Sequence, residues 1–218
     1  MWRTANRFWL IPALGLALVG LALVGCNFTQ PVVVKVGLVA PFEGRGRPIG
    51  YDVIYSARLA VREINQAGGL DGYRVALVAY DDSGDPALAA DVAQALAMDP
   101  DVIAVMGNWQ PETTAAAAPV YAAAGIPFLP MGEAPWGETA VDQFSAEFSA
   151  AYAATTPFDE QAGPYAGTAY DACQLLFAAM RQTIADSGAL EKTRLADNLH
   201  KVEIQGITGQ HLIFPGGK

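Results

Sequence analysis

The chain has 218 residues, a net charge of −9 from 13 Lys and Arg against 22 Asp and Glu, and 52% hydrophobic residues. Its negative charge argues against a nucleic-acid partner, because the phosphates would be repelled. The composition excludes a collagen-like, a disulfide-rich and a disordered chain, and the length fits one domain with a sizeable core.

The first 25 residues have the pattern of an export signal. Arg3 and Arg7 precede an apolar run over residues 8–24, and small residues stand just before Cys26. This end is similar to the lipobox of bacterial lipoproteins, which implies a signal peptide of residues 1–25, cleavage before Cys26, lipidation of Cys26 and anchoring to the membrane by that lipid. Removal of 25 residues leaves 193 and shifts the net charge from −9 to −11, because two arginines and no acids are lost.

The alternative for this end is an uncleaved N-terminal transmembrane anchor, because the 17 residues of the apolar run reach the lower limit of a bilayer span. Both interpretations predict that the rest of the protein lies outside the cytoplasm.

The next part of the chain alternates between strand and helix patterns. After a tether at residues 26–31, residues 32–40 form a nearly continuous β-branched and apolar run, which is typical of a strand buried on both faces of a parallel sheet. Asp85 followed by Pro86 is a typical start of a helix. The predicted elements are a strand at 32–40, a helix at 52–67, a strand at 73–80, a helix at 86–98, a strand at 102–106, a helix at 111–124 and a strand at 126–129.

The alternation stops after residue 129, and helices predominate in the rest of the chain. Amphipathic patterns predict helices over 141–154, 164–187 and 191–202, followed by a turn and a short strand at 211–214. Cys173 lies in the second of these helices, where we expect a buried, inert thiol. The whole pattern predicts an α/β fold, namely a doubly wound, Rossmann-like parallel sheet with helices on both faces.

Several stretches of the sequence together resemble one known family. They are VKVGLVAP at residues 34–41, REINQAGG at 62–69, YDD at 80–82, AGIP at 124–127 and AYDA at 169–172. These stretches are similar to those of the type I periplasmic solute-binding proteins of the branched-chain amino acid (Leu/Ile/Val) type, the substrate-binding lipoproteins of ABC importers. The resemblance implies a Rossmann-like lobe, an amino acid or another small polar solute as the ligand, and an ABC permease as a partner.

In that family two lobes close on the ligand, whereas this sequence has segments similar to only one of them. Residues 32–132 resemble the strand–helix units of the first lobe, and residues 139–214 resemble helices that return to the same lobe. We therefore expect a single lobe over residues 32–214, with weak or altered binding because the ligand would be half exposed. One alternative is a protein-interaction module, in which exposed Trp109 and Trp136 are covered by a second copy in a homodimer or by another partner. The other is a degenerate remnant that binds nothing.

Ligands of an open α/β sheet bind beyond the carboxyl ends of the strands, so the loops at that edge hold the candidate contacts. Residues 108–112 stand where the family has a Ser-rich turn, which weakens the expectation of an amino acid ligand. Glutamates at this edge suit a cation, and Trp109 suits a flat ring or a quaternary amine; solvated loop charges and packing are the alternatives. The candidate ligand-binding residues are Glu43, Arg45, Asn108, Trp109, Gln110, Met131, Gly132 and Glu133.

No pattern in the sequence indicates an enzyme. Residues 44–50 carry three glycines after the first strand, but their spacing departs from that of a dinucleotide-binding loop, and Pro48 interrupts the turn. The two histidines, His200 and His211, lack metal-ligand spacing. We therefore expect no catalytic residues, no cofactor and no metal site.

Overall fold

The computed structural model describes residues 31–214. Residues 1–30 lie outside the described residues; they include the predicted signal peptide, Cys26 and all of the predicted tether except Pro31. Among the helices that are described, none is both long enough and apolar enough to cross a membrane.

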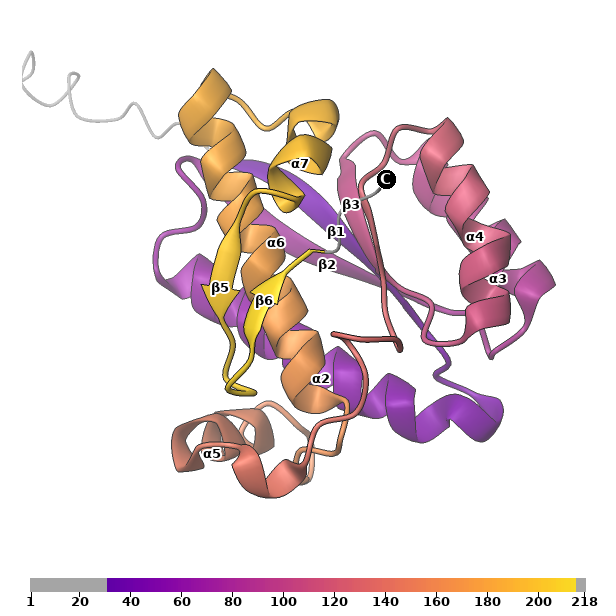
Figure 1. Cartoon of the computed structure of the whole chain (residues 1–218), viewed down its shortest axis with the longest axis vertical. Coiled ribbons are helices and arrows are strands. Elements are labelled where there is room, and N and C mark those ends of the chain that lie inside the picture. Colours follow the sequence, from indigo (N-terminus) through magenta and orange to yellow (C-terminus); the bar gives the residue numbers. More distant parts are fainter. Residues whose placement is uncertain (1–30, 215–218) are drawn as a thin grey trace, which may run out of the picture. The chain divides into compact units, whose positions relative to one another are not determined.

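Four parallel strands form the central sheet, in the order β2-β1-β3-β4 (Figure 1). The chain moves from β1 to β2 and then returns to the other side of β1 for β3 and β4. This topology confirms the predicted doubly wound α/β fold, and its strand order reverses between β1 and β3. The bounds are β1 (Val32–Ala40), β2 (Tyr73–Asp81), β3 (Val102–Gly107) and β4 (Phe128–Pro130).

Helices cover both faces of the sheet (Figure 1). Val36 and Leu38 of β1 pack into the core that includes α2 and α6, whereas Val39 packs into the core under α3 and α4. Burial on both faces explains why the sequence of β1 is almost continuously apolar. The helices concerned are α2 (Arg47–Gln66), α3 (Pro86–Met98), α4 (Pro111–Ala123) and α6 (Ala166–Ser187).

The helix starts follow local signals, with one start predicted too late. The Asp85 carboxylate accepts hydrogen bonds from the backbone N–H groups of Ala87 at 2.8 Å and Leu88 at 3.4 Å, so the predicted cap of α3 is confirmed. Helix α2 begins at Arg47, five residues before the predicted start. Pro48 lies in its first turn, where a missing N–H costs no helical hydrogen bond.

Short helices, 3-10 turns and a hairpin complete the described fold. These elements are the 3-10 turns η1 (Gly44–Gly46) and η2 (Val141–Gln143), the helices α5 (Ala146–Ala153) and α7 (Lys192–Leu199), and the antiparallel strands β5 (Glu203–Gln205) and β6 (His211–Ile213). The prediction of one helix over 141–154 was wrong at its start, because Ser145 caps α5 by accepting a bond from the N–H of Phe148 at 3.1 Å. Strand β5 was not predicted.

The late helices pack onto the helix that follows β1. Helix α6 lies against α2, and the Tyr170 hydroxyl donates to the Glu63 carboxylate at 2.5 Å. The next residue, Asp171, is buried and accepts bonds from the backbone N–H groups of Ile207 and Thr208. Residues 169–172 thus act in packing and hydrogen bonding. Cys173 is 1% exposed, and its burial raises the pKa of the thiol to about 12, in agreement with an inert thiol.

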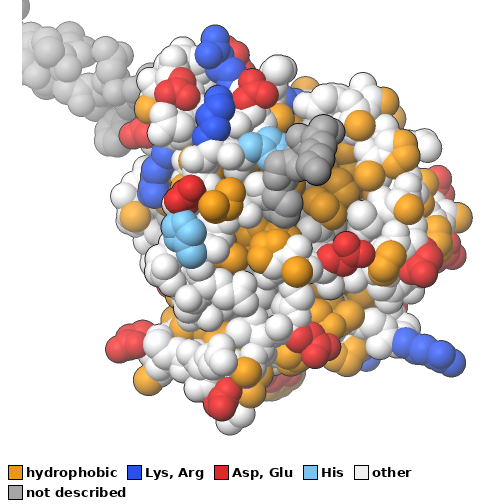
Figure 2. All heavy atoms as spheres, viewed as in Figure 1, with side chains coloured by type: hydrophobic (Ala, Val, Ile, Leu, Met, Phe, Trp, Pro, Cys, Tyr) orange, Lys and Arg blue, Asp and Glu red, His pale blue; other side chains and the backbone are white. Residues whose placement is uncertain are grey.

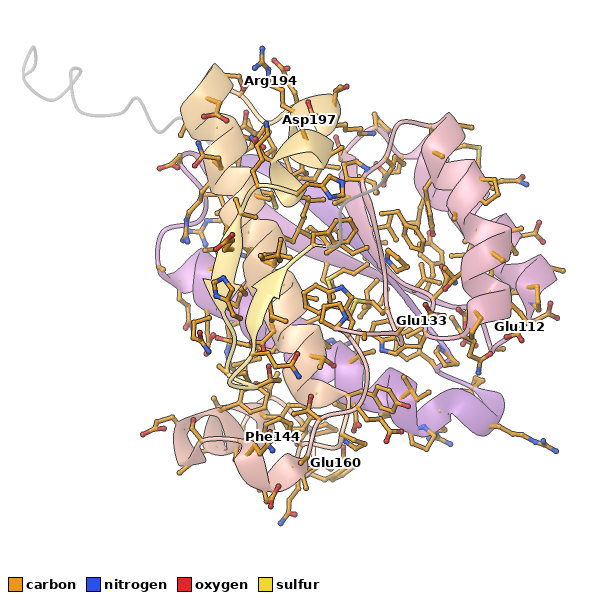
Figure 3. All side chains as sticks on the ribbon, viewed as in Figure 1. Glu112, Glu133, Phe144, Glu160, Arg194 and Asp197 are labelled. Atoms are coloured by element: carbon orange, nitrogen blue, oxygen red, sulfur yellow. The ribbon has the colours of Figure 1, made fainter. Side chains whose placement is uncertain are left out.

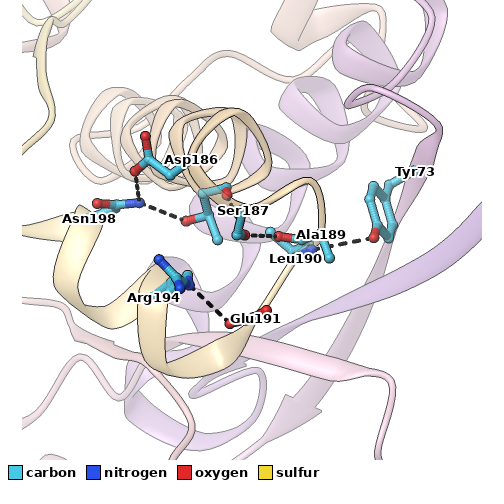
Figure 4. A network of polar contacts seen from close by, with 9 residues as sticks. Tyr73, Asp186, Ser187, Ala189, Leu190, Glu191, Arg194 and Asn198 are labelled. Atoms are coloured by element: carbon cyan, nitrogen blue, oxygen red, sulfur yellow. Dashed lines mark hydrogen bonds and ion pairs between the residues drawn. The ribbon is translucent and has the colours of Figure 1, made fainter.

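A polar network joins α6, α7 and β2 (Figure 4). The Asn198 amide of α7 donates to Thr183 Oγ1 at 3.2 Å and to the Asp186 carboxylate at 3.1 Å, both on α6. The backbone N–H of Leu190, between the two helices, donates to the Tyr73 hydroxyl at the start of β2. The bond to Tyr73 places this network at the start of β2, at the opposite end of that strand from the loops that follow the sheet.

Candidate functional site

The carboxyl ends of the four strands bring four loops to one edge of the sheet, because parallel strands all end on the same side. The loops span residues 41–46, 81–85, 107–110 and 130–136. Each of them contacts at least one of the others through a bond or packing contact described below. We call this set of loops the carboxyl edge.

Asp81 ties the first loop to the second. Its carboxylate accepts bonds from the backbone N–H of Phe42 at 2.7 Å, from the N–H of Ser83 at 2.8 Å and from the Ser83 hydroxyl at 2.6 Å. Partial burial raises the pKa of Asp81, but the hydrogen bonds from Ser83 and Phe42 outweigh burial and hold the pKa below its usual value. This carboxylate is therefore ionised and committed to holding the loops together.

Asp82 and Asn108 join the second loop to the third inside the protein. Both side chains are fully buried, and Asn108 Nδ2 donates to the Asp82 carboxylate at 2.8 Å. Burial raises the pKa of Asp82, although bonds from the Gly84 N–H and Asn108 act against that rise. The Thr114 hydroxyl donates to the carbonyl of Asn108 at 2.9 Å, so the third loop is also tied to α4.

Close packing at two glycines brings Gln110 against the first and second loops. A Cβ at Gly84 would lie 2.6 Å from Gln110 Oε1, and a Cβ at Gly46 would lie 2.6 Å from Pro41 Cβ and 3.5 Å from Gln110 Nε2. A Cβ at Gly50 would lie 2.5 Å from the Pro41 carbonyl oxygen. Gly46 and Gly50 thus permit close approach of chain to chain, which explains two of the three glycines without a bound nucleotide.

Trp109 and Trp136 are buried, so the expectation that both are exposed is wrong. They are 5% and 2% exposed and belong to the large core together with Met131. The cause is the path of the fourth loop, which folds back so that the N–H of Gly132 donates to the Trp136 carbonyl and a Cβ at Gly132 would lie 2.3 Å from the Trp109 carbonyl oxygen. The indole nitrogens have no hydrogen-bond partner among the described residues.

The eight candidate contacts therefore divide by depth. The side chains at the surface are those of Glu43, Arg45 and Glu133, with Gln110 and Gly132 half-buried. The buried ones are Asn108, Trp109 and Met131. Figure 3 shows Glu133 and Glu112 at the end of the sheet next to α4. We call the exposed and half-buried residues Glu43, Arg45, Gln110, Gly132 and Glu133 the rim of the edge, and the buried residues Asn108, Trp109 and Met131 its floor.

A cavity of about 460 Å³ lies beside this edge and was not predicted. Met131, Glu133 and Trp136 had been singled out from the sequence, but the contributions of α4 and Phe214 had not. The spacing of Thr114, Ala115 and Ala118 marks one stripe of a helix and offered a signal; Phe214 offered none, because it is remote in sequence. The lining residues are Pro111, Thr114, Ala115, Ala118, Pro130, Met131, Glu133, Ala134, Trp136 and Phe214.

Within residues 31–214, no three His, Cys, Asp or Glu side chains gather in a way that would hold a metal ion. The carboxylates of Asp81, Asp82 and Asp171 accept hydrogen bonds from protein groups. The exposed charges of Glu43, Arg45 and Glu133 and the apolar side chains near them can recognise a ligand by charge, hydrogen bonding and apolar contact.

Comparison with known proteins identifies the family. A family model described as "Periplasmic binding protein" matches residues 33–145, which is just over half of the chain. An "Amino acid binding protein" of Pseudomonas aeruginosa is 33% identical over 111 residues, which cover 51% of this chain and 30% of the relative. "Leu/Ile/Val-binding protein homolog 1" of Brucella abortus is 33% identical over 112 residues, covering 51% and 29%. The chain thus spans about 30% of the length of these curated relatives, which are named as binding proteins rather than enzymes.

Solved structures show the same fold. The substrate-binding protein LivJ of Streptococcus pneumoniae, in complex with isoleucine, has a TM-score of 0.68 at 18% identity and covers 82% of this chain and 91% of that one. A solute-binding protein of an ABC transporter from Rhodopseudomonas palustris, in complex with 3,4-dihydroxybenzoic acid, has a TM-score of 0.66 at 14% identity, with coverage of 81% and 87%. The resemblance seen in the sequence is confirmed: the chain belongs to the periplasmic binding protein family, and its fold is that of the type I members.

Proposed function

We propose that residues 32–214 form a single solute-binding lobe, with residues 32–132 supplying the strand–helix units and residues 139–214 the helices that return to them. The observation that carries this proposal is the carboxyl edge, where the buried Asp82–Asn108 pair and the bonds to Asp81 hold the loops in place beneath a charged rim. Rigid loops at this edge are what a ligand site of an open α/β sheet requires. The common packing of α2 and α6 in one core supports the assignment to one lobe.

The ligand of this proposal is a small polar solute, with amino acids as the first candidates. The names of the curated relatives support amino acids, whereas the ligands of the two solved structures show that this fold also accepts an aromatic acid. We assign rim contacts to Glu43, Arg45, Gln110, Glu133 and the backbone of Gly132. Asn108, Trp109 and Met131 form the floor and position the loops.

Binding is proposed to be weak, because one lobe covers only one side of a ligand and leaves the other side in water. The partners in this proposal are an ABC permease and the membrane, reached through a lipid on Cys26 after cleavage of residues 1–25. Membership of a periplasmic family implies a location outside the cytoplasm. The alternatives of an interaction module and a homodimer lose the two exposed tryptophans on which they rested, because both side chains are buried.

Thermal unfolding of the chain from residue 27 onward tests the function. Circular dichroism would follow the midpoint with leucine, isoleucine, glutamine, putrescine, 3,4-dihydroxybenzoate or glucose at millimolar concentrations. A ligand of the native state raises the midpoint in a saturable way. One compound with this effect supports the proposal, and its loss in Glu43→Gln or Arg45→Gln places the site at the rim. A cooperative transition that no compound shifts contradicts the proposal.

A further inference from the structure

The cavity beside the carboxyl edge lies between the two layers that flank β4. Pro111, Thr114, Ala115 and Ala118 of α4 line it from one layer, and Phe214, which follows β6, lines it from the other. Strand β4 is the last strand of the described sheet on this side. Figure 2 shows hydrophobic side chains gathered on the surface between the β5–β6 hairpin and α4.

The walls of this cavity are apolar apart from two residues. Eight of the ten lining residues are Pro, Ala, Met, Trp or Phe. Of the other two, Thr114 already donates its hydroxyl hydrogen to the carbonyl of Asn108, and Glu133 is the one charged residue among the described residues of the lining. Among the described residues, no Lys, Arg or His lines the cavity. The described lining therefore offers apolar contact and one negative charge, with no positive charge beside it.

We propose that this cavity binds a small apolar amine, with the ammonium group at the Glu133 carboxylate and the hydrocarbon against Met131, Trp136 and Phe214. The volume of about 460 Å³ is within the range of small-molecule sites. This inference rests on the proposed function, because it names the ligand class of a site that adjoins the same edge. It also gives Glu133 a specific role, distinct from that of the other rim charges.

The single negative charge in the described lining disfavours an amino acid, which carries a carboxylate in addition to the ammonium of the amine. An amino acid carries its carboxylate one carbon from the ammonium. This carboxylate would enter the cavity mouth close to Glu133, and no basic side chain among the described lining residues would pair with it. Like charges at such a distance repel each other, and an unpaired carboxylate loses water as it enters an apolar site. A decarboxylated ligand avoids both costs.

The test compares three compounds that share a phenylethyl skeleton. Isothermal titration of the chain from residue 27 onward would use 2-phenylethylamine, phenylalanine and 3-phenylpropionate, which carry an ammonium only, both charges and a carboxylate only. We expect the amine to bind at least about tenfold more tightly than phenylalanine and 3-phenylpropionate not to bind. A tenfold difference corresponds to about 1.4 kcal/mol.

Two variants and one control locate the site. Glu133→Gln removes the charge and is expected to weaken amine binding by about tenfold or more, and Ala118→Phe fills the cavity and is expected to abolish it. Glu112→Gln is the matched control, because Glu112 lies in the first turn of α4 but does not line the cavity. Thermal midpoints of all variants establish that they are folded.

Each outcome bears on the inference. Equal binding of amine and phenylalanine, or an unchanged affinity in Glu133→Gln, overturns it. Binding of phenylalanine or of leucine from the earlier compound panel, without binding of the amine, overturns it and leaves the proposed function intact. Binding of none of the compounds in either experiment contradicts both.

Discussion

Replacement of Asp171 by alanine is predicted to loosen the β5–β6 hairpin from α6. The Asp171 side chain is 1% exposed and accepts bonds from Ile207 N at 2.8 Å, Thr208 N at 3.2 Å and Thr208 Oγ1 at 2.7 Å. A Cβ at Gly206 would lie 2.2 Å from Asp171 Oδ2, so the turn sits directly on the carboxylate. This one side chain satisfies three donors, and alanine leaves all of them without their acceptor.

The magnitude follows from these bonds and from the cost of burying the carboxylate. A hydrogen bond to a charged group contributes about 1.5–3 kcal/mol, but burial raises the pKa of Asp171 and so opposes its ionised form. We expect Asp171→Ala to lower the free energy of unfolding by about 3 kcal/mol. For a chain of this size, that loss lowers the midpoint by roughly 6–12 °C.

Urea unfolding followed by circular dichroism measures this effect. Thr208→Val removes only the hydroxyl donor and is expected to cost about 1 kcal/mol. Asp197→Ala is the control, because Asp197 is an exposed carboxylate of α7, and a change at such a position costs within about 0.5 kcal/mol. If Asp171→Ala costs no more than Asp197→Ala, the reasoning about the hairpin is refuted.

Three further predictions concern ionisation, backbone geometry and thiol reactivity. Burial raises the pKa of Asp52 to about 6 against an ordinary 3.8, so the stabilisation is full below about pH 4, declines as the pH rises to about 6 and then stays lower. Because Asp52 is partly exposed, we expect the free energy of unfolding to fall by about 1 kcal/mol over this range. Urea unfolding between pH 4 and 7 should show this decline in the unchanged chain and not in Asp52→Asn. Gly132→Ala places a Cβ 2.3 Å from the Trp109 carbonyl oxygen at φ +89°, whereas Gly125→Ala, at φ +64°, meets nothing within 4 Å; differential scanning fluorimetry should show a clearly larger loss of midpoint for the first, and equal losses would contradict the packing of the fourth loop. Cys173, with its thiol pKa near 12, should resist iodoacetamide in the native chain from residue 27 and react in urea, as mass spectrometry would detect; rapid native alkylation would show that the thiol is accessible.

The sequence predicted the elements with strong local signals closely. Strand β1 and helix α3 matched their predicted bounds, because a continuous apolar run marks the first and Asp85 with Pro86 marks the start of the second. The start of α2 was misjudged because Pro48 and Gly50 are typical of loops as well as of a first helical turn. Strand β5 was missed because Glu203–Gln205 is too short and too polar for a period-two pattern to be visible.

The sequence predicted where the candidate site lies in the fold but not which of its side chains are buried. Parallel strands fix the edge at which the loops meet, so Glu43, Arg45 and Glu133 were expected near the carboxyl ends of the sheet. The burial of Trp109 and Trp136 depends on the fourth loop folding back over the end of β3, which no local pattern encodes. The cavity depends in addition on Phe214, which reaches it from the other end of the chain.

The most direct test of the central claim is an NMR titration of the ¹⁵N-labelled chain from residue 27 onward, with leucine and with 2-phenylethylamine. The claim is that the carboxyl edge of one lobe binds a small solute. It predicts that saturable amide shifts for at least one compound concentrate in residues 41–46, 107–112 and 130–136. Shifts confined to the β5–β6 hairpin or α7, or no saturable shifts with either compound, would contradict it.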